Sequence, residues 1–480
     1  MAFFNVRKEL VMSKFTKKKT DILFIIPPYH KRHGSGSLFP LGISSIIACL
    51  EQKNYTYDYI DCTQIISSLN DEDLRLLDEK LEQELLRFDP RLVGIGPCVT
   101  PGVKGLITIA NRCISVFGKD IIFAGGPFAS LPSQEWFFYD YLGLMYLIKG
   151  DGEEAICNAI GIVRKGGSLL SCSNVSTKGN SFMNINEKGL DGLPFPKRIQ
   201  IEKNSFSDRR RLKTCGKTAH IVASRGCPYS CSYCVSGNIK MPFRKRSAMS
   251  IVAEMEYLSE NYGIKDIVFY DDCFFTSPLT VHREVRDFCD LLKDKKLDMT
   301  WQIEIRPDII IQLTDDELVL LSESGCRQMN IGVEKTYDNG ASMFGKRFNY
   351  NELKSHLAHI HEVCQIQLTG TFILGGKGET KDSVRKLILA SSRMNLDQAE
   401  YSPLFVYPDT PIYKEMFSNP KEWFDVIMSS SDSLGEIVYE DDALDKDTLQ
   451  RMVRVAYRFF YKGTKYSDTE RITDRYNLKG

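Results

Sequence analysis

The feature that most constrains the fold is a repeated alternation of short apolar runs with helical stretches. Asp21–Ile26 is an almost continuous apolar run that stops at Pro27-Pro28, which is typical of a buried parallel strand. Strands and helices separated in this way predict a doubly wound parallel sheet with helices on both faces. The further candidates are strand-like Tyr55–Ile60, a charged helix near Asp71–Arg87, strand-like Leu92–Ile95, Ile121–Ala124 and Met145–Ile148, and a helix from Glu153.

A second alternating series begins near residue 220. Thr314 and Glu317 predict a capping box at the start of one of its helices, and Gly325 supplies the stop. Six strand–helix units predict a curved, partly open (β/α)6 barrel, and function in such barrels sits at the carboxyl ends of the strands. The strand candidates are His220–Ala223, Asp266–Tyr270, Met299–Ile305, Gln328–Gly332, Ile366–Leu374 and Ala399–Val406.

Both series together define an α/β chain with two domains. With 480 residues, the chain is long enough for several domains, and residues 166–205 are rich in Gly, Ser and Asn, as in a linker. The start of the first domain is preceded by a polar, basic stretch in which either Met1 or Met12 can be the true start. The expected parts are a flexible leader at 1–20, a first domain at 21–165, the linker, a barrel at 206–411 and a mainly helical tail at 412–480.

Composition argues against several classes of protein. Lys plus Arg and Asp plus Glu are balanced at 62 each, which gives no reason to expect nucleic acid or an anionic membrane as a partner. No apolar run approaches the roughly 20 residues that cross a bilayer, and residues 1–20 lack the long apolar stretch of a secretory signal, so none is expected. The 14 cysteines then belong in a reducing cytoplasm, where a tight cysteine cluster indicates metal binding.

One such cluster follows the first strand of the second series. Cys227, Cys231 and Cys234 have the spacing C-x3-C-x2-C, so three thiolates on one loop can ligate three irons of a [4Fe–4S] cluster. The fourth iron would stay open to the amino and carboxylate groups of S-adenosylmethionine, because an open metal position is where substrate chemistry happens. The alternative is a zinc site, which needs a fourth ligand from elsewhere in the chain. Candidates for that ligand are Cys215, Cys273 and Cys326.

From about Phe206 to Ile412 the chain resembles the radical S-adenosylmethionine (radical SAM) superfamily. The resemblance rests on the cysteine loop and on four segments at strand ends. These are Asp271-Asp272, Glu304-Ile-Arg306-Pro-Asp308, Gly332-Val-Glu334 and Gly370-Thr-Phe-Ile-Leu-Gly375. It implies that the three cysteines bind the cluster and that Tyr233, Arg306, Glu334 and Gly375 surround S-adenosylmethionine. It further suggests that Asp271, Asp272 and Glu304 contact either S-adenosylmethionine or substrate, although each carboxylate can instead pair with an arginine or cap a helix.

Before this cysteine loop, the first domain carries four segments in order: Pro27-Pro28, Phe39-Pro40-Leu41-Gly42, Gly125-Gly126-Pro127-Phe128 and Gly150-Asp-Gly-Glu153. In these segments it resembles the cobalamin-binding subgroup of the superfamily. The resemblance assigns cobalamin to the glycine-containing loops at the strand ends, where backbone can approach a ligand closely. No Asp-x-His-x-x-Gly segment is present, and this domain's histidines are His30 and His33, so cobalamin is expected to bind without a histidine lower ligand. The candidate cobalamin-binding residues are Pro28, Leu41, Gly42, Gly125, Gly126, Gly150 and Glu153.

These cofactors favour a radical C-methyltransferase, resembling class B, that acts on an unactivated carbon of a small molecule or peptide. A cyclase or rearrangement enzyme with the same cofactors is the first alternative, and a cobalamin and iron–sulfur sensor without catalysis is the second. A methylthiotransferase is a weaker hypothesis, because such relatives carry a second cluster and a terminal nucleic-acid-binding domain. An electron donor such as flavodoxin or ferredoxin is typical of the family.

Overall fold

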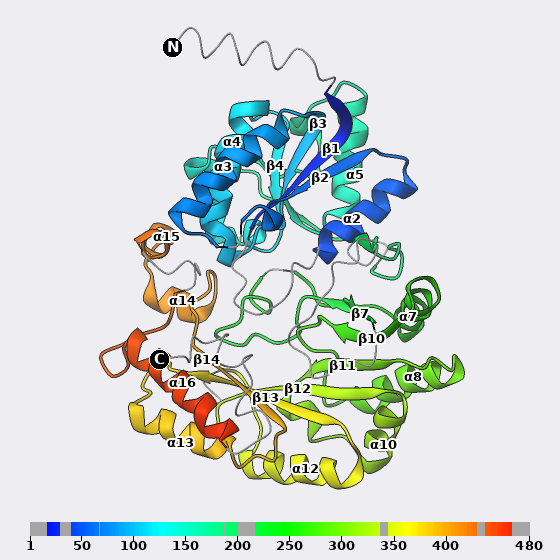
Figure 1. Ribbon diagram of the computed structural model, residues 1–480, viewed down its shortest axis with the longest axis vertical. Coiled ribbons are helices and arrows are strands. Elements are labelled where there is room, and N and C mark those ends of the chain that lie inside the picture. Colours follow the sequence, from blue (N-terminus) through cyan, green and yellow to red (C-terminus); the bar gives the residue numbers. More distant parts are fainter. Residues whose placement is uncertain are drawn as a thin grey trace.

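The computed structural model describes two α/β domains stacked along the long axis of the molecule (Figure 1). The described residues are 17–28, 40–66, 68–186, 189–199, 217–239, 241–336, 344–429 and 437–462. Several features of the sequence lie outside them: Met1, Met12, His30, His33, Cys215, the leader up to residue 16 and the tail beyond residue 462.

The first domain is a parallel sheet with the strand order β2-β1-β3-β4-β5-β6. Leu23 and Ile25 of β1 pack toward helices α3 and α4, whereas Ile22 and Phe24 pack toward α2 and α5, so β1 is buried on both faces as its apolar run predicts. The strands are β1 (Lys18–Ile26), β2 (Tyr57–Asp61), β3 (Phe88–Ile95), β4 (Ile122–Gly125), β5 (Tyr146–Gly150) and β6 (Met183–Asn184). The helices are α2 (Leu41–Gln52), α3 (Asp71–Leu85), α4 (Val103–Phe117) and α5 (Glu153–Arg164).

The segment expected to be a linker contributes structure to this domain. Its β6 pairs with β5 in parallel, through Lys149 with Met183 and Gly150 with Asn184. The strand order reverses direction between β1 and β3, and open parallel sheets bind ligands beyond the carboxyl ends of their strands at this kind of switch point.

The second domain is a parallel, curved sheet with the order β14-β13-β12-β11-β10-β7, which is a partial barrel with helices on its outside (Figure 1). The predicted fold class is confirmed. The strands are β7 (Lys217–Ile221), β10 (Ile264–Phe269), β11 (Thr300–Ile305), β12 (Cys326–Glu334), β13 (Gln367–Leu374) and β14 (Gln398–Pro403). The helices are α7 (Ala248–Tyr262), α8 (Val281–Asp294), α9 (Pro307–Ile310), α10 (Asp315–Glu323), α12 (Tyr350–Val363) and α13 (Lys381–Ser391). A short antiparallel pair, β8 (Ser224–Arg225) with β9 (Arg244–Lys245), flanks the cysteine loop.

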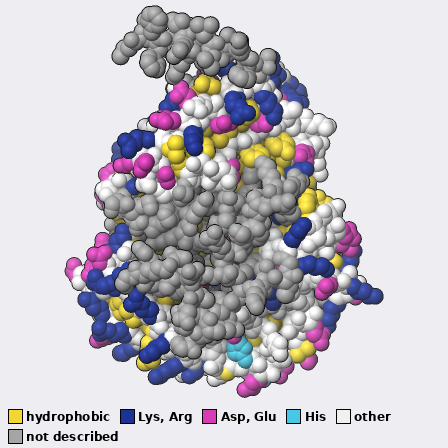
Figure 2. All heavy atoms as spheres, viewed as in Figure 1, with side chains coloured by type: hydrophobic (Ala, Val, Ile, Leu, Met, Phe, Trp, Pro, Cys, Tyr) yellow, Lys and Arg dark blue, Asp and Glu magenta, His cyan; other side chains and the backbone are white. Residues whose placement is uncertain are grey.

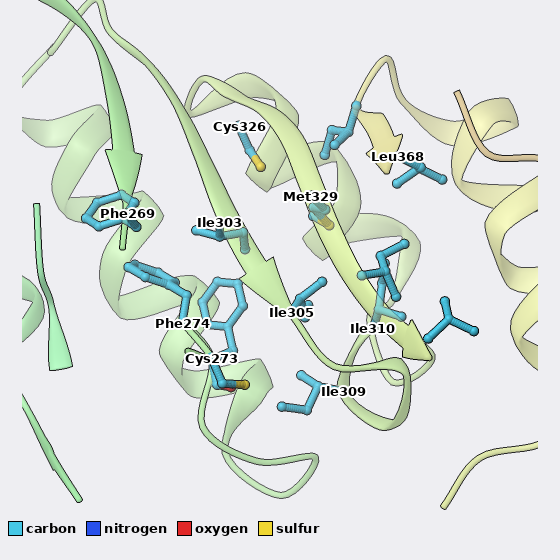
Figure 3. Close-up of a cluster of buried hydrophobic side chains, with 14 of the residues drawn as sticks. Phe269, Cys273, Phe274, Ile303, Ile305, Ile309, Ile310, Cys326, Met329 and Leu368 are labelled. Carbon is cyan, nitrogen blue, oxygen red and sulfur yellow. The ribbon is translucent and has the colours of Figure 1, made fainter. Parts of the chain in front are cut away.

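The apolar core of the barrel lies between the strands and the outer helices. Phe269, Ile303, Ile305 and Met329 are almost fully buried there, and Figure 3 shows them together with Phe274 and Ile309. The predicted capping box is present, since Glu317 N donates to Thr314 Oγ1 and Thr314 N donates to the Glu317 carboxylate. Because side chains alternate along a strand, every second strand residue points outward to this core. The residues between them face the inside of the barrel.

The region after residue 411 joins the two domains. It contains α14 (Pro411–Met416), α15 (Pro420–Ser429) and α16 (Lys446–Tyr461). The fully buried Trp423 and the adjacent Phe424 of α15 contact aromatic rings of the first domain, with ring centroids 6.1 Å from Phe128 and 4.8 Å from Tyr141. Helix α16 instead packs along β14 at the edge of the barrel.

The described part of the surface in Figure 2 carries basic and acidic side chains mixed over both domains. Among the described residues, no helix is both long enough and apolar enough to cross a membrane.

Trp423 of α15 packs against the aromatic ring of Phe128 in the first domain. Trp423→Ala is therefore expected to lower the free energy of unfolding by about 3–5 kcal/mol. Denaturant unfolding followed by circular dichroism measures the change. The matched control is Val426→Ala on the same helix, where the side chain is 44% exposed and little should change. Equal stabilities of the two variants would contradict α15 as a packed connection between the domains.

Candidate functional site

The cysteine loop leaves β8 and folds back tightly on itself. Cys231 is buried, Cys227 and Cys234 are partly exposed, and all three are free thiols. Cys234 N donates to Cys231 O at 3.1 Å, and the Asn238 side-chain amide donates to the carbonyl oxygens of both cysteines. A side chain at Gly237 would overlap the Tyr229 carbonyl, so the loop closes only with glycine there. The loop is thus shaped by its own backbone and presents three sulfurs.

Burial favours the neutral thiols in the free loop. It raises the pKa of Cys227 to about 11 and also raises the pKa of Cys234, so iron binding would have to release their protons. The Arg306 guanidinium donates to Cys231 Sγ at 3.6 Å and lies 3.6 Å from the centroid of the Tyr229 ring. A fixed positive charge beside the loop would offset the negative charge that three thiolates bring.

A zinc site would need a fourth ligand beside the three cysteines. Among the described residues, no group of three or more His, Cys, Asp or Glu side chains, the three cysteines included, is placed around a single metal position. Figure 3 shows Cys273 and Cys326, two candidates for a fourth ligand, toward opposite ends of the barrel strands.

Two of the residues expected around S-adenosylmethionine, Tyr233 and Glu334, are in contact at the carboxyl end of β12. The Tyr233 hydroxyl donates to Glu334 Oε1 at 3.0 Å, and Lys346 Nζ donates to the same oxygen at 2.9 Å. Glu334 has a φ of 62°, a conformation that side chains rarely adopt and that is retained where the surroundings impose it. Arg306 lies apart from this pair, because it is held by Asp308 at 2.8 Å and faces Cys231.

Gly375 is positioned by a residue that sequence reasoning missed. Lys335 is fully buried and donates to Ile373 O, Gly375 O and Glu379 Oε2 at 2.8, 3.0 and 2.7 Å. Burial lowers the pKa of this lysine, and the Glu379 carboxylate opposes that shift. Its position directly after Glu334 was the available signal. The lysine therefore ties the end of β12 to the glycine turn after β13.

The three carboxylates expected near S-adenosylmethionine or substrate have different neighbours. Asp271 accepts from Ala223 N at 3.1 Å and from the Ser224 hydroxyl, and burial raises its pKa to about 6. Asp272 accepts from the Ser236 hydroxyl at 3.1 Å. Both aspartates thereby contact the segment that carries the cysteines. Glu304 instead accepts from the Asn330 amide at 2.9 Å, inside the barrel.

A cavity of about 360 Å³ lies at the carboxyl ends of the first sheet. Its wall contains six of the seven candidate cobalamin residues: Leu41, Gly42, Gly125, Gly126, Gly150 and Glu153. Pro28 is elsewhere, with its ring against Gly105 of α4. Gly126 has a φ of 116°, and a side chain there would meet Cys98 N at 2.6 Å, so backbone forms this part of the wall.

The same cavity extends to the second domain. Leu193, Pro194, Phe195 and Pro196, at the end of the segment expected to be a linker, line it together with Arg225 and Gly226, which directly precede Cys227. Most of the wall is apolar, which is typical of sites for small ligands and cofactors. The structure therefore brings the glycine loops of the first domain and the start of the cysteine loop to one cavity.

Buried charges join these two loops. Arg225 donates to Asp151 Oδ1 at 2.8 Å and to both carboxylate oxygens of Glu153. Arg244 also donates to Asp151, and Ser45 at the start of α2 donates to Glu153 Oε1 at 2.7 Å. Burial opposes ionisation of Asp151, but Arg244 and Arg225 bring its pKa below the usual range. The loop Gly150–Glu153 is thereby fixed against Arg225, which lies two positions before Cys227.

Glu153→Gln should lower the free energy of unfolding by about 1.5–3 kcal/mol, because it removes a charged acceptor of Arg225 and Ser45 from a buried site. It should also lower the iron content after reconstitution, because the cysteine loop loses an anchor. Thermal unfolding and iron analysis measure both effects. Glu154→Gln, at the next position of the same helix, is the control, and equal behaviour of the two variants would count against this ionic connection.

Lys335→Met is expected to destabilise the protein by about 3–5 kcal/mol, since the buried Glu379 carboxylate loses its partner. Lys377→Met removes a lysine whose side chain is 74% exposed and paired with Glu415, and should cost under about 1 kcal/mol. Denaturant titration compares the variants. If both cost the same, Lys335 has no special part in holding the turn.

Part of the chain matches a family model, and most of its length is similar to known proteins. Residues 221–390 match the model of the radical SAM superfamily. An uncharacterized methyltransferase of Pyrococcus horikoshii is 24% identical over 413 residues, which are 84% of either chain. An anaerobic magnesium-protoporphyrin IX monomethyl ester cyclase of Cereibacter sphaeroides is 22% identical over 457 residues, 92% of this chain and 70% of the cyclase.

Solved structures share the two-domain fold. The radical SAM methyltransferase TsrM of Kitasatospora setae, solved with cobalamin and a [4Fe–4S] cluster, superposes with a TM-score of 0.60 at 18% identity, over 84% of this chain and 78% of TsrM. The cobalamin-dependent radical enzyme OxsB superposes with a TM-score of 0.64 at 15% identity, over 91% of this chain and 66% of OxsB. The cysteine loop, the strand-end residues and the family model together identify residues 221–390 as a domain of the radical SAM superfamily.

Proposed function

We propose that the protein is a cobalamin-dependent radical SAM C-methyltransferase that acts on an unactivated carbon of a small molecule or peptide. The observation that carries the proposal is the single cavity between the domains, because it runs from the glycine loops of the first sheet to Arg225 and Gly226 at the cysteine loop. Cobalamin bound in this cavity would lie next to the start of the cysteine loop, so the two cofactors would be neighbours.

Each cofactor has residues that fit it. Cys227, Cys231 and Cys234 would hold the [4Fe–4S] cluster, and Tyr233, Arg306, Glu334 and Gly375 would surround S-adenosylmethionine. When bound, these cofactors would supply a 5′-deoxyadenosyl radical for hydrogen abstraction, and cobalamin would supply a methyl group. The protein's own part is to hold the cysteine loop, to align it with the glycine loops through Arg225, and to exclude water with the apolar wall.

The residues expected to bind cobalamin offer backbone and apolar side chains on which the flat corrin ring could lie. Gly125 and Gly126 present backbone, and Leu41 and Gly42 begin α2 beside them. Binding without a histidine lower ligand stays a prediction. The histidine found in the described wall, His220, comes from β7 of the second domain and stacks on Tyr270 with ring centroids 4.2 Å apart.

A cyclase or rearrangement enzyme with the same cofactors is the second candidate. It is favoured by the likeness to the magnesium-protoporphyrin cyclase, which extends over 92% of this chain. A sensor without catalysis is a third candidate of a different class. The contacts of Glu334 with Tyr233 and Lys346 argue for a site shaped to hold a ligand beside the cluster and so count against the sensor.

The test follows two products at once. The protein is purified without oxygen, loaded with iron, sulfide and cobalamin, and given S-adenosylmethionine and a reductant such as a flavodoxin or ferredoxin. Formation of both 5′-deoxyadenosine and S-adenosylhomocysteine is expected, because a methyltransferase uses S-adenosylmethionine both as radical source and as methyl donor.

Cys231→Ala is expected to abolish 5′-deoxyadenosine, and Cys364→Ala, at the end of α12, should leave it unchanged. If wild-type protein gives 5′-deoxyadenosine without S-adenosylhomocysteine, the cyclase or rearrangement reading replaces methyl transfer. If neither product forms while cluster and cobalamin are bound, the sensor replaces both.

A further inference from the structure

The inside of the barrel is polar, unlike the packed interior of a closed (β/α)8 barrel. Bulky branched apolar side chains fill such closed barrels in layers. Here Ile303 and Ile305 of β11 face the helices (Figure 3), while Gln302 and Glu304, at the alternate positions of the same strand, face inward. The same alternation places Gln328 and Asn330 inside on β12, Thr369 and Thr371 on β13, and Gln398 and Glu400 on β14. Four successive strands thus give carboxamide, hydroxyl and carboxylate groups to the interior.

These side chains line a cavity of about 380 Å³. Its described wall contains four carboxylates, those of Asp271, Asp272, Glu304 and Glu400, and four carboxamides, but no lysine, arginine or histidine. Tyr233, Arg306, Glu334 and Gly375, which are expected around S-adenosylmethionine, are not part of this wall. Asp271, Asp272 and Glu304, which are expected to contact either S-adenosylmethionine or substrate, are part of it. The wall shares no residue with the apolar cavity between the domains.

Hydrogen bonds along the wall use its donors internally. Gln328 Nε2 donates to Asn330 Oδ1 at 2.8 Å and to Thr369 Oγ1 at 3.1 Å, which occupies both of its protons. Asn330 Nδ2 donates in turn to Glu304 Oε1 at 2.9 Å. A carboxylate has about four lone-pair sites and no proton to give, so the capacity that the wall offers to a ligand is mainly acceptor capacity.

The two ends of the cavity differ in charge. At the amino ends of the strands Arg327 Nε donates to Asp266 Oδ1 at 2.8 Å, and its Nη2 donates to Gln302 Oε1 at 2.9 Å. The positive charge of this arginine balances the negative charge of Asp266 at this end of the barrel. At the carboxyl ends Asp271 and Asp272 contact Ser224 and Ser236 beside the cysteines. The acidic end therefore lies toward the loop where the radical would be generated.

A stacked pair of rings stands between the two cavities. His220 lines the apolar cavity and Tyr270 lines the polar one, and their centroids are 4.2 Å apart. The polar cavity is thus adjacent both to the proposed cobalamin site and to the cysteine loop, which is the position that a substrate of the proposed reaction needs.

Resting on the proposed function, we infer that the substrate is a small, hydrophilic molecule that carries at least one ammonium group, bound inside the barrel by Glu304, Glu400 and the carboxamides between them. A cationic donor complements an acceptor-rich wall of negative charge, and bringing opposite charges together offsets the cost of burying each. A flat, apolar tetrapyrrole such as the one named for the cyclases does not match this polar lining.

Binding tests this inference without any need for turnover. The probes are two matched pairs, 1,4-diaminobutane with 1,4-butanediol and D-glucosamine with D-glucose, together with protoporphyrin IX. Dissociation constants are measured by saturation-transfer NMR at neutral pH on protein loaded with cluster and cobalamin. The ammonium probe of each pair should bind at least about tenfold more tightly than its hydroxyl partner.

Variants locate the binding. Glu400→Gln and Glu304→Gln keep the shape of the wall and remove one charge each, so each should raise the dissociation constant of the ammonium probes by about tenfold without affecting the hydroxyl probes. Asp382→Asn, an exposed residue on α13, is the control and should change neither. The inference is overturned if the hydroxyl probes bind as well as the ammonium probes, if neither glutamate variant matters, or if protoporphyrin IX binds in their place.

The outcome is independent of the proposed reaction. Protein that binds ammonium probes but forms neither 5′-deoxyadenosine nor S-adenosylhomocysteine would keep the binding site and reject the methyltransferase. Protein that forms both products while ammonium and hydroxyl probes bind equally would keep the methyltransferase and reject this class of substrate.

Discussion

Arg225 occupies the place where the two halves of the molecule depend on one another. It lies two residues before the first cysteine of the loop, and its guanidinium is shared between Asp151 and Glu153 of the first domain. Both carboxylates are at most 5% exposed. Buried charges of this kind are costly when separated, so the domains have one favoured relative position. The cavity between them, and hence the distance between any two ligands bound at its ends, follows from that position.

The two cavities divide the chemistry by polarity. The one between the domains is bounded mainly by glycine backbone and apolar side chains, with charged groups such as Glu153 and Arg225 in its wall, which suits a flat ligand. The one inside the barrel is bounded by carboxylates and carboxamides, which suits a small, charged ligand. The rings of His220 and Tyr270 mark the border. A radical can take a hydrogen from more than one carbon of a substrate that is free to turn. A radical enzyme therefore needs a separate pocket that holds its substrate in one orientation.

Much of the fold was predictable from the sequence, because parallel strands buried on both faces leave apolar runs such as Asp21–Ile26 and their helices carry local signals such as Thr314 with Glu317. The six strand candidates of the barrel correspond to its six strands. The short strand β6 was missed, since two residues leave no periodicity. The packing of α15 on the first domain was also missed, because nothing local to Trp423 indicates a partner some 300 residues earlier in the chain.

The candidate site divides in the same way. The spacing of the three cysteines is a local signal, and the glycine loops could be placed at strand ends. Lys335 and Arg225 could not be assigned, because each acts through partners distant in sequence, Glu379 for the first and Glu153 for the second. The polar residues of the barrel strands could likewise be read in the sequence. It could not be predicted from the sequence that Gln328, Asn330 and Glu304 line the same cavity.

Helix α16 has a consequence for the open barrel as a whole. Among the described strands, β14 ends the sheet without a further strand beside it, and such an edge normally offers its backbone to any passing strand. Here Tyr401 N and Ala399 N donate to the hydroxyls of Tyr457 and Tyr461, and the same hydroxyls donate back to the two carbonyls. The two phenol hydroxyls thus make the hydrogen bonds to Ala399 and Tyr401 that a neighbouring strand would otherwise make. The barrel can remain incomplete, wide enough for its ligands, and still give no template for self-association.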